Sequence, residues 1–190
     1  MIEKKAEIPS ERQSAIVEAA TGVFLRYGFA RTTMGDIASA AGLSRPTLYQ
    51  SFPDKARIFR AVIEAMVAAE LRNLREGLAA RDGFGAQLGF LCESWTLHGF
   101  DLVQASPDAR DMFDLGFEVV QESYAIFEDL LAEFIAKHPQ RVSHHPPPHD
   151  LARMIVAGMK GFKDVARDRD DLLTMIQSLC ETVRVTVCGA

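Results

Sequence analysis

The segment at residues 44–51 carries the side chains best suited to contacting a ligand. Helical spacing places five hydrogen-bonding side chains on its outer face. They belong to Arg45, Thr47, Tyr49, Gln50 and Ser51. Side chains of these types contact base edges and phosphates in protein–DNA interfaces. An arginine can form two hydrogen bonds with a guanine, and a glutamine can do so with an adenine, so this segment could read a DNA sequence.

Three short helices are predicted to position this segment. Ser10 with Gln13 forms a capping-box signature for the first helix, and Thr33 begins the second helix. Gly42 permits the positive φ that a tight turn requires. Ser44 then caps the third helix, which ends at Phe52 because proline follows. Three short helices with a tight turn before the third predict a helix-turn-helix unit.

The remaining sequence also has helical apolar spacing, and no convincing alternation of strand type occurs. We therefore predict an all-α fold in which the three-helix helix-turn-helix domain precedes a six-helix domain. Asp54 can cap the first of these six helices, which breaks at Arg81–Gly83. The others are expected at about 84–103, from Ser106 onward, through 119–134, and at about 150–166 and 170–187.

The charge of the chain is distributed unevenly. The net charge is −5, which alone argues against a nucleic-acid partner. Residues 1–60 nevertheless hold nine basic and six acidic residues, whereas residues 61–190 hold twelve and twenty. A basic N-terminal segment in an otherwise acidic chain allows phosphate contact at that end of the chain. The excess of three positive charges in residues 1–60 is small, so a chance distribution of charged residues would also explain it.

The first residues resemble a known family. The runs YGFARTTMGDIA, at 27–38, and AGLSRPTLYQSFPDK, at 41–55, are similar to the signature of TetR-family transcriptional regulators. The likeness is dense over about residues 12–60, with glycine, cap, aromatic and lysine positions in register. The rest of the chain resembles the family only in length and helical pattern.

The resemblance implies a set of DNA contacts. Thr33, Ser44, Thr47 and Tyr49 stand where family members contact phosphates, and Tyr49 also where they contact bases. Lys55 stands where the family grips a phosphate at a helix N-terminus. Pro46, together with Arg45 and Gln50, stands where members vary and set the operator sequence. Phe52 is better explained as a core aromatic, and Gly35 makes a base contact from the second helix doubtful.

The resemblance also implies a domain organisation and partners. We expect a DNA-binding domain at residues 1–55 and a ligand-binding and dimerisation domain at 56–190. Two units paired across a two-fold axis would read half-sites about 34 Å apart on a palindromic double-stranded operator. Two apolar stripes could form the homodimer interface, or could equally pack inside one subunit. The stripes are Ile155, Met159 and Phe162, and Leu173, Ile176, Leu179, Val183 and Val187.

A small apolar or aromatic effector is expected to bind within the second domain and to release DNA by shifting the conformational population. The candidate lining residues are aromatic, apolar or hydrogen-bonding. They are Leu91, Trp95, His98, Met112, Phe113, Phe117, Tyr124 and Phe127. Each one singly is more often a core residue, and Trp95 with His98, one turn apart, is the first pair to test. Activation in place of repression stays open.

Two other classes compete with a DNA-binding regulator. Four histidines in the proline-rich stretch 138–149 (His138, His144, His145 and His149) could bind metal, but a solvated loop explains them better. A helical small-molecule-binding protein without specific DNA binding is the other alternative. No GxSxG, P-loop or GxGxxG motif indicates an enzyme, and we expect no cofactor. The scattered cysteines and the lack of a long apolar run favour a cytoplasmic protein without a membrane partner.

Overall fold

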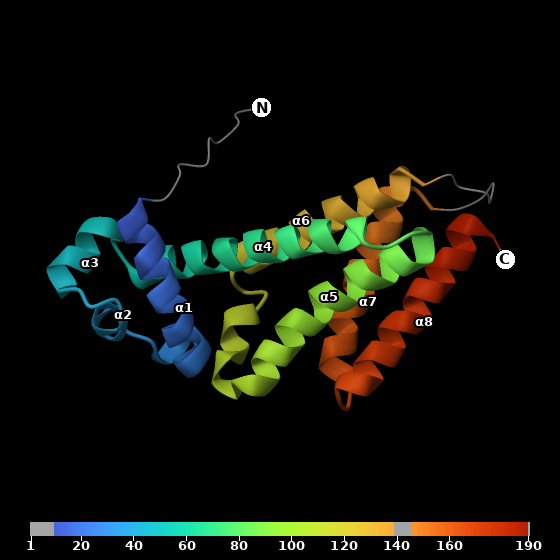
Figure 1. Cartoon of the computed structure of the whole chain (residues 1–190). Coiled ribbons are helices and arrows are strands. Elements are labelled where there is room, and N and C mark those ends of the chain that lie inside the picture. Colours follow the sequence, from blue (N-terminus) through green and yellow to red (C-terminus); the bar gives the residue numbers. More distant parts are fainter. Residues whose placement is uncertain (1–9, 139–145, 190) are drawn as a thin grey trace. The chain divides into compact units, whose positions relative to one another are not determined.

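The computed structural model describes residues 10–138 and 146–189, and it is helical, with no strand in those two ranges. The predicted all-α class is confirmed, as is a three-helix N-terminal segment followed by six further helical elements (Figure 1). In chain order, the sixth helical element, η1, is a 3-10 helix and not an α-helix. In chain order they are α1 (Glu11–Arg31), α2 (Met34–Ala40), α3 (Arg45–Ser51), α4 (Lys55–Ala79), α5 (Phe84–Ala105), η1 (Pro107–Phe113), α6 (Glu118–Ala136), α7 (Pro148–Val165) and α8 (Arg169–Cys188).

Contacts divide the chain into two compact units. The N-terminal unit comprises Met1–Met66 with Ser106–Asp114, and the C-terminal unit comprises Val67–Ala105 with Leu115–Ala190. The segment Ser106–Asp114 thus joins the first three helices although it is distant in sequence. The functional boundary predicted between residues 55 and 56 stays a prediction.

Local hydrogen bonds explain where the first helices begin. Ser10 and Gln13 form the expected capping box of α1, and Thr33 and Asp36 form a second box at α2. The Ser44 hydroxyl accepts from the Thr47 amide at 3.3 Å and caps α3. These side chains satisfy amides that a helix N-terminus leaves without an intrahelical partner.

The turn between α2 and α3 depends on Gly42, whose φ of +66° favours glycine. Beneath it, Leu48 is fully buried and faces inward from α3. The core of this unit is aromatic, since the rings of Phe24 and Phe59 meet edge to face at 5.5 Å. Phe52 is buried, as expected for a core aromatic.

The helix η1 packs against α1 within the N-terminal unit. At the contact, α1 leaves helical geometry at Gly28, whose φ is +73° and ψ is 170°. A Cβ atom at this position would lie 2.3 Å from the carbonyl oxygen of Asp108. Only glycine therefore fits, because the backbone conformation and the close approach both exclude a side chain.

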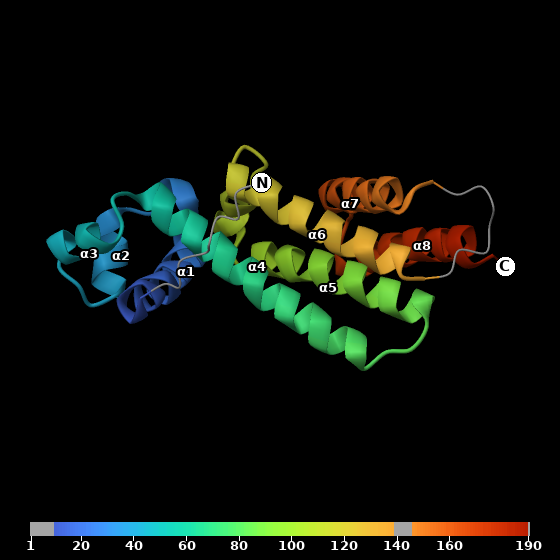
Figure 2. The same cartoon turned by 90° about the horizontal axis from the view of Figure 1, so that it is seen from above.

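The C-terminal unit has a separate core. Helix α6 packs on α7, α5 packs on α8, and α7 contacts both α8 and α5 (Figure 2). Leu88, Phe127, Ile155 and Ile176, from four different helices, are almost completely buried there. No helix in the part of the chain that the structure describes is long and apolar enough to cross a membrane.

Replacing Gly28 with alanine should destabilise the N-terminal unit. The glycine-only conformation costs about 1–3 kcal/mol for another residue, and the Asp108 carbonyl must also move. We expect a lower thermal unfolding midpoint by circular dichroism and faster amide hydrogen exchange around the turn.

The matched control is Gly22→Ala in the same helix, where a Cβ meets no atom within 4 Å. Alanine is favoured over glycine in a helix interior, so G22A should be neutral or slightly stabilising. Equal stability of G28A and G22A would contradict the proposed constraint.

Candidate DNA-binding site

The outer face of α3 presents the side chains that the sequence predicted to read DNA. Arg45, Pro46 and Gln50 are exposed, and half of the Tyr49 surface is accessible. Thr47 and Ser51 are half-buried at the edges of the same helix. The helix therefore offers hydrogen-bonding groups outward while Leu48 holds it to the core.

Local hydrogen bonds already engage the predicted phosphate-binding hydroxyls of Thr33, Ser44 and Thr47, so a phosphate contact must compete with them. The Thr33 hydroxyl donates to the Asp36 carboxylate at 2.7 Å, and the hydroxyls of Ser44 and Thr47 lie 2.7 Å apart. The pKa of Asp36 lies below its usual value, because the Thr33 hydroxyl and then the Thr33 amide hydrogen-bond its charged form. The positive charge of Arg45 acts in the same direction.

Lys55 has a different set of partners from the predicted phosphate. Its Nζ donates to the carbonyl oxygens of Phe29 at 2.6 Å and Thr32 at 2.8 Å, and lies 3.4 Å from that of Ala30. It also lies 4.3 Å from the centre of the Phe29 ring. An ammonium group has three donors, so a phosphate contact must compete with these carbonyls. Phosphate binding by Lys55 stays a prediction, and its observed contacts stabilise the turn between α1 and α2.

The carboxylate of Asp111, which lies in η1, binds backbone amides of the same turn. Its two carboxylate oxygens accept the amides of Phe29 and Ala30, each at 2.8 Å. In addition, Arg31 forms an ion pair with Asp108. Asp111 was not among the residues predicted from the sequence, because 82 residues separate it from Phe29 and no local pattern indicates such a contact.

The predicted effector residues are divided between the two units. Met112 and Phe113 belong to the N-terminal unit, whereas the other six belong to the C-terminal unit. Leu91, Met112 and Phe127 are fully buried, and Phe117 is half-buried. Each of these side chains therefore contributes to packing in the described structure.

Trp95 and His98 lie at the edge of the C-terminal core. The Trp95 ring stacks on Phe127 at 4.4 Å with an interplanar angle of 5°. His98 is exposed, and its Nδ1 lies 3.8 Å from the carboxylate of Glu70, an acid that is almost completely buried. The Tyr124 hydroxyl accepts from Lys163 at 2.7 Å. Their role in effector binding stays a prediction.

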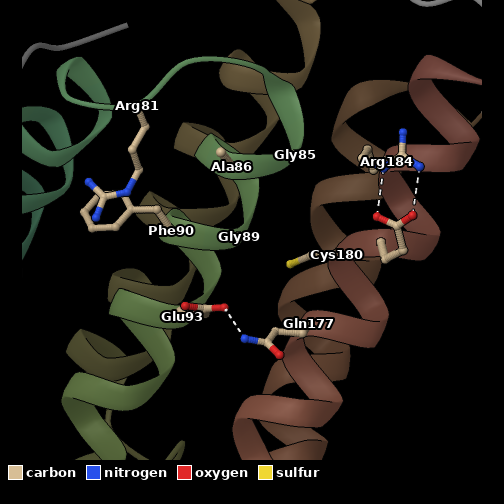
Figure 3. A pocket seen from close by; sticks show the side chains of 10 residues that line it. Arg81, Gly85, Ala86, Gly89, Phe90, Glu93, Gln177, Cys180 and Arg184 are labelled. Carbon is tan, nitrogen blue, oxygen red and sulfur yellow. Dashed lines mark hydrogen bonds and ion pairs between the residues drawn. The ribbon is translucent and has the colours of Figure 1, made fainter.

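Two of the open grooves that the described residues of the C-terminal unit form are lined by none of the eight predicted effector residues. One, of about 450 Å³, lies between α5 and α8, where Glu93 accepts from Gln177 at 3.1 Å and Arg184 pairs with Glu181 (Figure 3). The other, of about 460 Å³, combines an apolar floor that includes Leu71 and Leu130 with charged groups such as Arg75.

The predicted dimer stripes contribute mainly to the core of the chain itself. Five of the eight residues have little or no accessible surface: Ile155, Met159, Ile176, Val183 and Val187. These five side chains pack in the core of their own chain, and a role for them in an interface stays a prediction. Phe162, Leu173 and Leu179 are half-buried, and their role in an interface stays a prediction.

The histidine-rich stretch lies only partly within the described structure. His144 and His145 lie outside the described residues. The His138 Nδ1 lies 2.8 Å from the carbonyl oxygen of Phe134, and His149 lies beside Glu128 and Asp129. Residues 10–138 and 146–189 contain no group of three metal-binding side chains.

Comparisons with known proteins agree with this geometry. Residues 16–62 match the family described as "Bacterial regulatory proteins, tetR family". The chain is 26% identical to the HTH-type transcriptional repressor ComR of Escherichia coli, over 91% of this chain and 88% of ComR. It is 36% identical to the HTH-type transcriptional regulator TtgR of Pseudomonas putida, over 35% of this chain and 31% of TtgR.

Solved structures share the fold. A transcriptional regulator from Cytophaga hutchinsonii superposes with a TM-score of 0.71 at 23% identity, covering 91% of this chain and 96% of that protein. FadR from Bacillus subtilis, solved in complex with stearoyl-CoA, superposes with a TM-score of 0.68 at 16% identity, covering 93% and 98%.

Together, the site and the comparisons define a DNA-binding transcriptional regulator of the helix-turn-helix class. Within that class, residues 16–62 match the N-terminal domain of the TetR family. The resemblance seen in the sequence is confirmed. ComR and TtgR are both named as transcriptional regulators and not as enzymes.

Replacing Asp111 with alanine should loosen the turn between α1 and α2. The amides of Phe29 and Ala30 lose charged acceptors, and such hydrogen bonds contribute about 1.5–3 kcal/mol each. We expect faster hydrogen exchange at these two amides and a lower thermal midpoint.

An exposed acid of the C-terminal unit, Asp82, supplies the control variant D82A. Its exchange rates at Phe29 and Ala30 should equal those of the unmodified protein. Unchanged exchange in D111A would show that the carboxylate does not hold the turn.

Proposed function

We propose that this regulator represses transcription by binding a two-fold symmetric operator as a homodimer and is released by a small apolar or aromatic effector. The observation that carries the proposal is the outer face of α3, where Arg45, Tyr49 and Gln50 are exposed on a helix held by caps and a buried leucine. Rigid support matters, because base readout requires the side chains to be placed accurately.

Each side chain has a proposed role. Arg45 and Gln50 contact base edges, Pro46 shapes the contact surface between them, and Ser51 supports it at the edge of the helix. Thr33, Ser44, Thr47 and Tyr49 contact phosphates and fix the helix in the groove. Lys55 adds positive charge near the backbone of the DNA, where phosphates dominate affinity and make it depend on salt.

The relatives support repression and effector binding as proposals. ComR, which matches most of this chain, is named a repressor, and FadR of the same fold has been solved with stearoyl-CoA. We place the effector in the C-terminal unit, with Trp95 and His98 as the first residues to test. Release requires that the effector bind the DNA-free conformation more tightly than the DNA-bound one.

A second copy of the chain is the proposed partner of the outer face of α7. Met154 and Val165 are apolar and more than 60% exposed, and Gly161, also exposed, lies on the same helical face. Beside this stripe a Cβ at Gly158 would lie 3.4 Å from Leu179 of α8, which shows how closely the two helices approach. A small-residue, apolar face of this kind allows helices of two copies to approach closely.

The DNA-binding proposal predicts a two-fold symmetric consensus when bound DNA is selected from a random pool. Arg45→Ala should relax preference at one base pair of each half-site, because a bidentate arginine–guanine contact provides about 1–3 kcal/mol of discrimination. Affinity for the selected operator, measured by fluorescence anisotropy at several salt concentrations, should fall about 5-fold to 150-fold.

The control is Arg72→Ala, which removes an exposed arginine from the C-terminal part of α4. It should leave both affinity and preference unchanged. Equal affinity of the unmodified protein for the consensus and for random DNA would refute a specific operator. The selected operator then allows a screen for molecules that release it.

The dimer proposal predicts that Gly161→Arg yields monomers, because the substitution places a bulky charge on the α7 stripe. The mass should be measured by light scattering after size exclusion, and operator affinity should fall because one unit reads only one half-site. Ala125→Arg, at an exposed position of α6, is the control and should remain dimeric. A persistent G161R dimer would exclude this face.

A further inference from the structure

The side chain of Arg45 lies against the second helix. Although Arg45 begins α3, a Cβ built at Gly35 of α2 would lie 2.5 Å from Nη2 of Arg45 and 3.1 Å from both Cζ and Nε. Real Cβ atoms do not approach other atoms this closely, so the guanidinium occupies the volume that any side chain at residue 35 would fill.

The negative charge of the residue that follows Gly35 favours the same position of the Arg45 guanidinium. Asp36 follows Gly35, and its carboxylate is held by the Thr33 amide at 2.9 Å and the Thr33 hydroxyl at 2.7 Å. The pKa of Asp36 is lowered by these hydrogen bonds and also by the Arg45 charge. An ionised carboxylate on α2 attracts the guanidinium of α3, so charge and available space agree.

A side chain at residue 35 would redirect Arg45 without breaking the fold. The atoms that it meets belong to the far end of a flexible side chain, which can move at little cost. Alanine is also a better helix former than glycine. The consequence would therefore be a new direction for the guanidinium, while the backbone of α2 and α3 stays in place.

We infer that Gly35 is a specificity-determining position of the operator contact, and that it acts by allowing the Arg45 guanidinium to lie on the bare backbone of α2. Gly35 is a positioning residue here, since the atoms proposed to touch the base belong to Arg45. The inference rests on the proposed function, in which Arg45 reads a base. A bidentate contact to guanine depends on the aim of the guanidinium, so a redirected side chain changes base preference.

The test is a double-mutant cycle on the full-length protein. The unmodified protein, G35A, R45A and G35A/R45A are each used to select DNA from a random pool. Anisotropy then gives their affinities for the operator and for single-base variants of it. We expect G35A to change discrimination about tenfold at the same base pair that R45A affects. In the R45A background, G35A should produce no further change.

Controls separate this effect from a change in folding. G22A, a glycine-to-alanine exchange in α1 with open space around the Cβ, should leave base preference unaltered. Circular dichroism should show equal helicity for every variant. Gly35→Ser provides a second substitution that fills the same volume, and it should shift preference at the same base pair.

The outcomes are distinguishable. An equal effect of G35A with and without Arg45 would overturn the inference, because the glycine would then act independently of the guanidinium. An unaltered preference in G35A would overturn it as well. If R45A itself changes no base preference although the unmodified protein selects a consensus, the proposed role of Arg45 fails while a specific operator stands, and the inference fails with that role.

Discussion

The helix-turn-helix depends on how the chain turns from α1 into α2. At Gly28 the backbone departs from helical geometry and α1 ends at Arg31, so the amides and carbonyls of this last turn need new partners. Asp111 accepts two of the amides, and Lys55 donates to the carbonyls on the other side of the turn. The acidic side chain of Asp111 thus binds the amides of this segment, and the basic side chain of Lys55 binds its carbonyls. Because α2 begins directly after this turn, these bonds set the direction from which α2 and α3 proceed.

The turn also explains why a segment outside the matched family domain belongs to the N-terminal unit. The family match ends at residue 62, yet η1 supplies Asp111 and the carbonyl of Asp108 that restricts Gly28. The flanks of η1 are α5 and α6, whose residues contribute to the C-terminal core. The chain therefore connects the core of one unit to a polar contact in the other.

Features set by neighbouring residues could be predicted from the sequence, and features set by distant partners could not. The caps at Ser10, Thr33 and Ser44 and the turn at Gly42 follow from residue types a few positions apart, and all four are present. The Asp111 contact joins residues 82 positions apart, so no local signal exists. Lys55 is a third case. Its position in the motif could be recognised from the sequence. Whether its ammonium group binds backbone carbonyls or a phosphate depends on the three-dimensional structure.

The apolar stripes of α7 and α8 show the limit of periodicity most clearly. A helical repeat of apolar residues reports that one face is buried, but it does not report which chain covers that face. Ile155 and Ile176 are covered by their own chain, so the periodic signal is accounted for by the core. The homodimer proposed above uses a face that the periodicity does not mark. On α7 that face combines Met154 and Val165 with the exposed glycine at 161, a weak sequence signal because glycine carries no apolar side chain. The same reasoning applies to Gly35, since its contribution is the space that it leaves for Arg45.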